Sequence, residues 1–231
     1  MKTIGLLGGM SWESTISYYQ YLNRYAQQQY GGLSSAPIVL YSVDFSPLER
    51  LQHENNWQAI TDILIMGARQ VEAGGADCLL ICTNTMHKVA DEIAEAIDIP
   101  LVHIADAVAE KLLENQTTTA GLLGTMFTMQ EDFYSKRLEQ KYGIKVLTPT
   151  PKQQQSVHDI IYNELCQGKV SDTSRKQYVD IIDSLSSQGA EGIILGCTEI
   201  PLLVQQTHTT IALYDTVAIH ANSAAQQFLK L

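Results

Sequence analysis

The chain has 231 residues, of which 45% are hydrophobic and 17% are charged, and this composition is that of a compact protein and not of a disordered one. Its formal net charge is −10 and its Lys and Arg residues form no cluster, which argues against a nucleic-acid partner. No uninterrupted apolar run approaches the roughly 20 residues of a membrane-spanning helix, so no membrane partner is expected either.

Short runs rich in Ile, Leu and Val alternate with longer amphipathic stretches, a pattern typical of a mostly parallel sheet covered by helices on both faces. In the first half of the chain, strands are predicted at residues 3–7, 37–43, 78–82 and 101–104. Helices are predicted at residues 12–30, 56–73, 87–96 and 104–115. The stretch at residues 44–52 is expected to be a loop.

The second half shows the same alternation. Strands are predicted at residues 119–123, 145–147, 192–195 and 210–213. Helices are predicted at residues 129–142, 154–167, 171–188 and 216–231. Four strands in each half indicate two similarly built parts.

The two halves also share sequence. The segment at residues 75–85, GADCLLICTNT, aligns without a gap with GAEGIILGCTE at residues 189–199, and TIGLLGGM at residues 3–10 matches TAGLLGTM at residues 119–126. Two blocks repeated in the same order indicate an internal duplication. We therefore expect an α/β fold of two pseudo-symmetric three-layer α/β/α domains with mostly parallel sheets, and an active site in the cleft between them. The predicted domains are residues 1–103 with 215–231, and residues 104–214.

The first repeated block ends in Thr83, Asn84 and Thr85, just past a predicted buried strand and just before a predicted helix. Open α/β sheets bind ligands at the carboxyl ends of their strands, and backbone N–H groups together with Asn and Thr side chains suit a carboxylate. The alternative is that Thr83 or Asn84 is an ordinary helix N-cap. The alignment weakens this alternative, because it places Thr83 opposite Cys197.

Cys197 is therefore a candidate acid or base. A thiol near a helix N-terminus has a pKa lowered from about 8.5 toward neutrality, and this is the setting expected here. A free cysteine is more often a small buried hydrophobe, which is what we expect of Cys78 and Cys166. Cys82 has better acid-base chemistry than its neighbour Thr83, but strand alternation predicts that Cys82 faces away from the site.

The four cysteines have neither metal-ligand spacing nor the density of a secreted disulfide scaffold. We expect reduced thiols in a cytoplasmic protein, and no metal site.

Glycines end the first strand of each half, in the sequences GGMS at residues 8–11 and GT at residues 124–125. They permit a close approach of a ligand to the backbone. The GxGxxG spacing is missing, which argues against a dinucleotide site. In the predicted loop at residues 44–52, Gln52 is a candidate ligand and Arg50 a candidate cation, although both would also suit an exposed loop.

Together these residues resemble the aspartate/glutamate racemase family over nearly the full chain. The likeness lies in GGM after the first strand, TNTMH after the third, G-T-x-x-T at residues 124–128 and GCTE at residues 196–199. It implies a racemase without cofactor or metal that exchanges the α-proton of a small amino-acid substrate between two bases on opposite faces, here Thr83 and Cys197. By motif position, the substrate-binding residues would be Met10, Ser11, Asn84, Thr85, Thr125, Thr128 and Thr198, with Glu199 as a charge partner of Cys197.

One motif position departs from the family. Typical members have cysteine at both base positions, whereas this chain has Thr83 at the first, and a hydroxyl is a far weaker acid than a thiol. We therefore expect unequal efficiency with the two enantiomers. The family implies an acidic amino acid as the substrate.

Several alternatives stay open from the sequence. They are a racemase of broader amino-acid specificity, a related cysteine-dependent isomerase or decarboxylase, and a non-catalytic relative that binds amino acids. The oligomeric state is also open, with a homodimer among the assemblies that the sequence allows.

Overall fold

The computed structural model describes residues 1–230, which form two compact units. The first unit comprises residues 1–104 and the residues from His220 onward, and the second comprises Ala105–Ile219. Both boundaries fall at or within helices, α5 (Ile104–Glu114) and α11 (Thr216–Phe228). In the described part of the chain, no helix is both long enough and apolar enough to cross a membrane.

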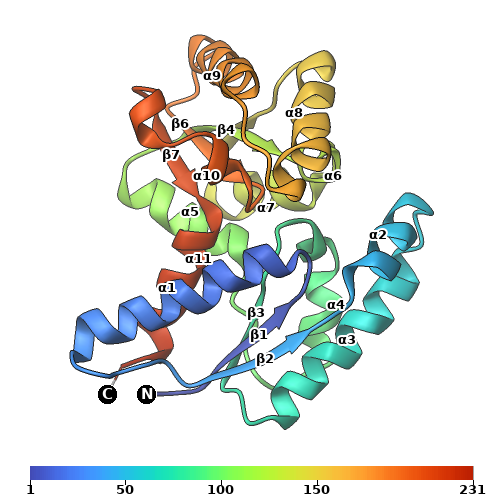
Figure 1. Cartoon of the computed structure of the whole chain (residues 1–231), viewed down its shortest axis with the longest axis vertical. Helices are drawn as coiled ribbons and strands as arrows, with labels where there is room; N and C mark the ends of the chain where they lie inside the picture. Colours follow the sequence, from blue (N-terminus) through green and yellow to red (C-terminus); the bar gives the residue numbers. More distant parts are fainter. Residues whose placement is uncertain (231) are drawn as a thin grey trace. The chain divides into compact units, whose positions relative to one another are not determined.

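The first unit is built on a parallel sheet of β1 (Ile4–Gly8), β2 (Ile38–Ser42) and β3 (Cys78–Ile81) in the order β2-β1-β3. Every residue of β1 and β3 is buried, as expected for strands that carry helices on both faces. The helices α1 (Trp12–Tyr30) and α3 (Trp57–Ala73) lie on opposite faces of this sheet (Figure 1). The unit therefore has three layers.

Alternation along β1 decides which residues meet which helix. A side chain placed at Gly8 would collide with Thr15 of α1, whereas Leu7 points to the other face and lies against Gly67 of α3. The start of the sheet is joined to α11, because the Lys2 amide donates to the Phe228 carbonyl at 2.9 Å. The two ends of the described chain accordingly lie together in this unit (Figure 1).

The second unit repeats this plan with one more strand. Its parallel sheet has the order β5-β4-β6-β7 and consists of β4 (Thr119–Gly124), β5 (Lys145–Leu147), β6 (Gly192–Gly196) and β7 (Ala212–Asp215). The central strands β4 and β6 pair from Ala120 with Gly192 to Gly124 with Gly196. Their carboxyl ends therefore lie at the same edge of the sheet.

Helices α8 (Pro151–Asn163) and α9 (Asp172–Ser187) cover one face of this sheet, and their buried side chains form a single core with those of β4 and β6. On the other face, the Tyr214 ring fills the space beside Gly192, and its hydroxyl group lies 2.9 Å from Thr117 Oγ1. Asn115, just after α5, donates to the same hydroxyl group at 3.1 Å, so α5 ends on this second face and the unit also has three layers. The predicted fold class, two similar α/β/α parts with parallel sheets, is confirmed.

Several predicted elements were wrong in detail. The strand expected at residues 101–104 is only an isolated bridge between Leu79 and Leu101. Pro100 has no N–H to donate to a ladder, and α5 begins at Ile104, so too few residues are left for a strand. The loop expected at residues 44–52 is the helix α2 (Phe45–His53), which begins where the Asp44 carboxylate accepts from the Ser46 amide at 3.1 Å.

Three predicted helices are interrupted. The helix expected at residues 154–167 is α8, which ends at Asn163, followed by the 3₁₀ helix η2 (Leu165–Gln167). The helix expected at residues 129–142 is divided at Glu131, whose extended backbone separates α6 (Met126–Gln130) from α7 (Asp132–Tyr142). The helix expected at residues 87–96 is a 3₁₀ helix, η1 (Thr85–Val89), followed by α4 (Ala90–Glu95). The last helix ends at Phe228, and residue 231 of that prediction lies outside the described residues.

A third stretch is similar in the two halves, DAVA at residues 106–109 and DTVA at residues 215–218, but its aspartates do not keep the same role. Asp215 accepts from the Val217 and Ala218 amides at 2.9 and 3.2 Å and so caps α11. Its sequence counterpart Asp106 instead accepts two hydrogen bonds from Arg137, at 2.6 and 2.8 Å. The predicted domain boundaries, residues 1–103 with 215–231 and residues 104–214, stay a prediction.

The repeat provides a matched pair of glycines for a stability test. A methyl group at Gly5 would lie 2.3 Å from Val71 Cγ1 and 2.6 Å from the Cys78 carbonyl oxygen, whereas at Gly121 the closest atom is the mobile end of Ile193 at 2.6 Å. We expect Gly5→Ala to lower the free energy of unfolding by about 3 kcal/mol and Gly121→Ala by about 1 kcal/mol, measured by urea denaturation. Equal losses would contradict this account of the packing.

Candidate active site

The candidate residues of the first unit lie on loops that leave one edge of its sheet. Strands β1 and β3 pair in parallel up to Leu7 and Ile81, and the Cys82 amide continues the ladder by donating to the Leu7 carbonyl at 2.9 Å. The loop that carries Met10 and Ser11 therefore begins beside the loop that carries residues 83–85. This adjacency follows from the parallel pairing of two neighbouring strands.

Thr83 is the partly exposed member of the TNT sequence, whereas Asn84 and Thr85 are buried. Asn84 occupies the N-cap position of η1 but its side chain makes no capping hydrogen bond. The amide group of Asn84 is thus not used as a cap.

The turn after β1 depends on Gly9. Its φ is +92°, and a side chain there would come within 2.2 Å of the Val43 carbonyl oxygen, so only glycine fits. The Gly9 amide donates to Thr15 Oγ1 at 2.9 Å, and the Thr15 hydroxyl donates to the Ser11 carbonyl at 3.1 Å. Met10 is 4% exposed and belongs to the apolar core of this unit, together with side chains of α2 and η1.

The prediction that Gln52 lies on a loop was wrong. Gln52 lies in the last turn of α2 and is 4% exposed. Its Oε1 atom is buried and has no hydrogen-bond partner among the described residues. A buried acceptor without a partner costs free energy unless a bound molecule supplies a donor. Arg50 in the same helix is exposed.

In the second unit, the loops after β4 and β6 leave the same sheet edge. Thr125 is the N-cap of α6, and its hydroxyl oxygen accepts from the Thr128 amide at 3.4 Å and lies 3.2 Å from the Thr128 hydroxyl. Thr128 is fully buried, and its methyl group lies against Gly124 and Gly196. Thr128 thus supports Thr125 and the two strand ends.

Cys197 follows β6 directly and is 8% exposed. Its thiol donates a hydrogen bond of 3.1 Å to Glu199 Oε2, an atom that also accepts from the Thr198 hydroxyl at 2.5 Å. Glu199 is itself 6% exposed. A buried carboxylate therefore lies directly against the candidate thiol.

The expected lowering of the Cys197 pKa was wrong. Burial, and next the negative charge of Glu199, raise the pKa of this thiol well above its ordinary value. The helix that follows, α10 (Ile200–Leu203), has only four residues and does not offset these two effects. The resting form of Cys197 is thus the thiol, with Glu199 as its acceptor.

The other cysteines are not poised for chemistry. Cys82 is fully buried, which raises its thiol pKa, and burial raises the pKa of Cys78 to about 12. The expectation that Cys166 is buried was wrong, because it is exposed, but desolvation and next the charge of Glu199 still raise its pKa to about 12. All four cysteines are free thiols. Among residues 1–230, no group of three His, Cys, Asp or Glu side chains is arranged to hold a metal ion.

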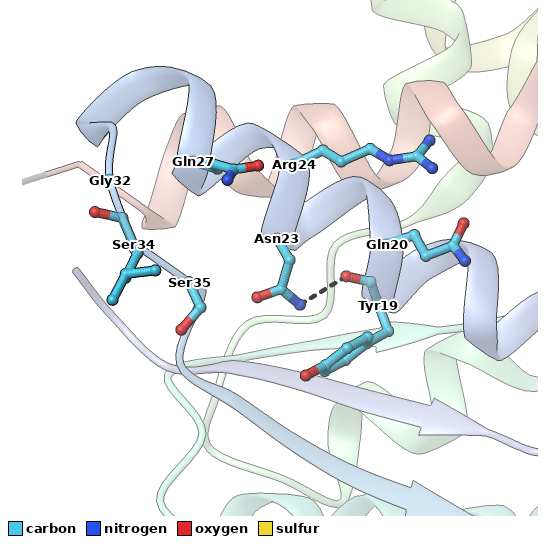
Figure 2. Close-up of a pocket in the computed structure, with 9 residues that line it drawn as sticks. Tyr19, Gln20, Asn23, Arg24, Gln27, Gly32, Ser34 and Ser35 are labelled. Atoms are coloured by element: carbon cyan, nitrogen blue, oxygen red, sulfur yellow. Dashed lines mark hydrogen bonds between the residues drawn. The ribbon is translucent and has the colours of Figure 1, made fainter.

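A surface pocket lies away from these residues, between α1 and the loop that follows it. Figure 2 shows its lining, which includes Tyr19, Asn23, Arg24 and Ser35. None of the predicted site residues lines it, and the one hydrogen bond drawn there, from the Asn23 side chain to the Tyr19 carbonyl at 2.8 Å, stays within α1. It is therefore not part of the candidate active site.

Sequence reasoning missed two buried histidines of the first unit, His103 and His220. Their rings lie close to His87 of the TNTMH sequence, with centroids 4.6 and 5.8 Å from that of His87 respectively. In the sequence, His103 is marked only by its place directly before α5. His220 is marked only by its place in an Ala-rich helix. Neither signal points to a partner, because the contacts join segments far apart in the chain.

Comparisons with known proteins agree with this architecture. The model of the family described as Asp/Glu/Hydantoin racemase matches residues 7–224. A broad specificity amino-acid racemase of Bacillus subtilis is 26% identical over 98% of both chains. Among solved structures, a candidate Asp/Glu racemase from Yersinia pestis is 49% identical, with a TM-score of 0.94. An aspartate racemase homologue from Pyrococcus horikoshii is 33% identical, with a TM-score of 0.87. Each of these two alignments covers 100% of both chains.

The effect of Glu199 on Cys197 is open to a direct test. We expect Glu199→Gln to lower the pKa of the Cys197 thiol, because the substitution removes the adjacent negative charge, and each pKa unit lost raises the thiolate fraction about tenfold. Alkylation by iodoacetamide at pH 8, mapped by mass spectrometry, should thus be faster at Cys197 in the variant. Buried Cys78 should stay unlabelled in both proteins as an internal control, and an unchanged rate at Cys197 would contradict the assignment.

Proposed function

Because the chain belongs to the Asp/Glu/hydantoin racemase family and is therefore a racemase, we propose that it inverts amino acids without a cofactor, by moving the α-proton between Thr83 and Cys197 on opposite faces of the α-carbon. The observation that carries this proposal is the 3.1 Å hydrogen bond from the buried Cys197 thiol to Glu199. It supplies the thiol with a group that can take its proton.

Cys197 works in two protonation states in this mechanism. To act as a base, the thiol passes its proton to Glu199 along the existing hydrogen bond, and the resulting thiolate removes the α-proton. To act as an acid, the thiol gives its own proton to the carbanion. The raised pKa of Cys197 favours the second state at rest, so a substrate meets the acid form first.

Thr83 is the weaker of the two groups. It occupies the position after β3 that corresponds to Cys197 after β6, and it is partly exposed. As an acid, its hydroxyl donates a proton to the carbanion that Cys197 has made. As a base it must first lose a proton that a hydroxyl holds far more tightly than a thiol does.

The unequal efficiency that the sequence suggests cannot appear in kcat/KM. Because the two enantiomers have equal free energy, the ratio kcat/KM must be the same in both directions. The inequality appears instead in kcat and KM separately, and in α-proton exchange with retention of configuration. Such exchange needs only the base on the side of the α-proton. It is therefore faster for the enantiomer whose α-proton faces Cys197.

The polar groups at the strand ends provide the binding groups of this proposal. Backbone and side-chain donors at Ser11, Asn84, Thr85, Thr125 and Thr198 would hold the carboxylate and stabilise the carbanion. The unpartnered Oε1 of Gln52 would accept from the ammonium group. Thr128 would act by holding Thr125, and Met10 by closing the apolar side.

We propose aspartate or glutamate as the substrate, following the family. A broader range is the second candidate, because the Bacillus subtilis relative is named a broad specificity amino-acid racemase. Circular dichroism of single enantiomers incubated with the protein distinguishes the two.

We also propose that the protein acts in the cytoplasm as a homodimer. Support for the assembly comes from apolar side chains exposed on α1, Trp12, Ile16 and Tyr19, and from Leu40 on the edge strand β2. Sedimentation velocity of the purified protein tests the assembly.

Variants at the two positions separate the two steps. Thr83→Ala should lower the inversion rate by roughly 10²- to 10⁴-fold, yet leave deuterium exchange with retention for one enantiomer, because Cys197 alone performs that exchange. Cys197→Ser should lose both reactions. Chiral chromatography and mass spectrometry of the amino acid recovered from deuterated water measure them together.

A gain of function at Thr83 complements the two losses of activity. Thr83→Cys places a thiol at both positions, so the two enantiomers should exchange at similar rates. Full exchange in Cys197→Ser would overturn the assignment, provided that its circular dichroism spectrum and unfolding temperature match those of the unmodified protein.

A further inference from the structure

His87 lies in η1, four residues after Thr83, and is 3% exposed. Its Nδ1 is 2.8 Å from the Thr83 carbonyl oxygen, and its Nε2 is 3.2 Å from the backbone nitrogen of Ile104. A backbone amide can only donate, so Nε2 is the acceptor and carries no proton. Nδ1 of the neutral ring therefore carries the proton and donates it to Thr83.

His220 of α11 is hydrogen-bonded to Val102, two residues before Ile104. Its Nε2 is 2.7 Å from the Val102 carbonyl oxygen, which can only accept, so Nε2 carries the proton. Its Nδ1 accepts from the Tyr18 hydroxyl at 2.8 Å. His220 is fully buried, and burial lowers its pKa to about 4, which keeps this ring neutral.

These contacts form two hydrogen-bonded pairs that are joined only by the backbone of residues 102–104. Tyr18 donates to His220, His220 donates to Val102, the Ile104 amide donates to His87, and His87 donates to Thr83. Every donor in the two pairs meets an acceptor, and each ring nitrogen has one role. All of these residues belong to the first unit.

We propose that His87, as the neutral Nδ1–H tautomer, is the positioning residue of Thr83: it fixes the Thr83 carbonyl and with it the direction of the Thr83 hydroxyl. The inference rests on the proposed function, which makes Thr83 a proton-transfer group. Edge-on contacts with the rings of His103 and His220 leave the imidazole of His87 little freedom to rotate. Such support matters for a hydroxyl, because a weak acid transfers its proton only from a near-ideal position.

Two substitutions at His87 separate positioning from packing. The amide nitrogen of Asn occupies the place of Nδ1, whereas that of Gln occupies the place of Nε2. We expect His87→Gln to lower the inversion rate by about 10- to 100-fold and His87→Asn by about threefold or less. Exchange with retention through Cys197 should be unchanged in both variants. The matched control is His53→Gln, because His53 is an exposed histidine of the same unit.

The outcomes separate this inference from the proposed function. Inversion that survives Thr83→Ala would overturn the proposed function itself. If Thr83→Ala abolishes inversion while His87→Gln retains the full rate, the positioning role of His87 is overturned. A loss of inversion and of retention exchange in equal proportion would indicate a purely structural role and would also overturn it.

A second measurement needs no variant. Long-range ¹H–¹⁵N correlation spectra of the unmodified protein at pH 7 should show His87 as the neutral Nδ1–H tautomer. The Nε2–H tautomer, or a doubly protonated ring, would contradict the hydrogen-bond directions on which the inference stands.

Discussion

Parallel pairing of two central strands is the constraint on which both units depend. In each unit the first strand, β1 or β4, lies between its neighbours and pairs with the strand that carries the candidate base. Because the strands are parallel, the loops that follow them leave the same edge. Small residues at the ends of β1, β4 and β6, among them Gly8, Gly124 and Gly196, let threonine side chains pack beneath those loops. The chemistry is thus determined by which residue follows each strand.

At these equivalent positions the two units have diverged in chemistry while keeping their geometry. The second unit buries a thiol against a carboxylate, and burial followed by the negative charge of Glu199 raises the pKa of this thiol. In the first unit, the backbone carbonyl of Thr83 accepts from His87, and the segment at residues 102–104 is hydrogen-bonded to both His87 and His220. In the proposed mechanism, the environment of Cys197 sets its protonation state, whereas the environment of Thr83 sets its orientation.

Much of this arrangement could be predicted from the sequence, because the repeat aligns residues that occupy the same position in similar sheets. The alignment of Thr83 with Cys197 and the parallel sheets follow from local patterns. The depth of burial around Cys197 does not, and for this reason the predicted direction of its pKa shift was wrong. The partners of His87 were also out of reach, since Ile104 and His220 approach it only in the folded unit. The helix α2 could have been predicted, because Asp44 is a typical N-cap residue.

The most direct test of two unequal proton-transfer groups is α-deuterium incorporation by the unmodified protein in deuterated water, followed from each pure enantiomer of aspartate and of glutamate. At low conversion, before the product can turn back, the mechanism predicts deuterium in the inverted product from both enantiomers, and much faster incorporation into the recovered starting material for one of them. Equal incorporation into the recovered material of both enantiomers, or no incorporation at all, would contradict it.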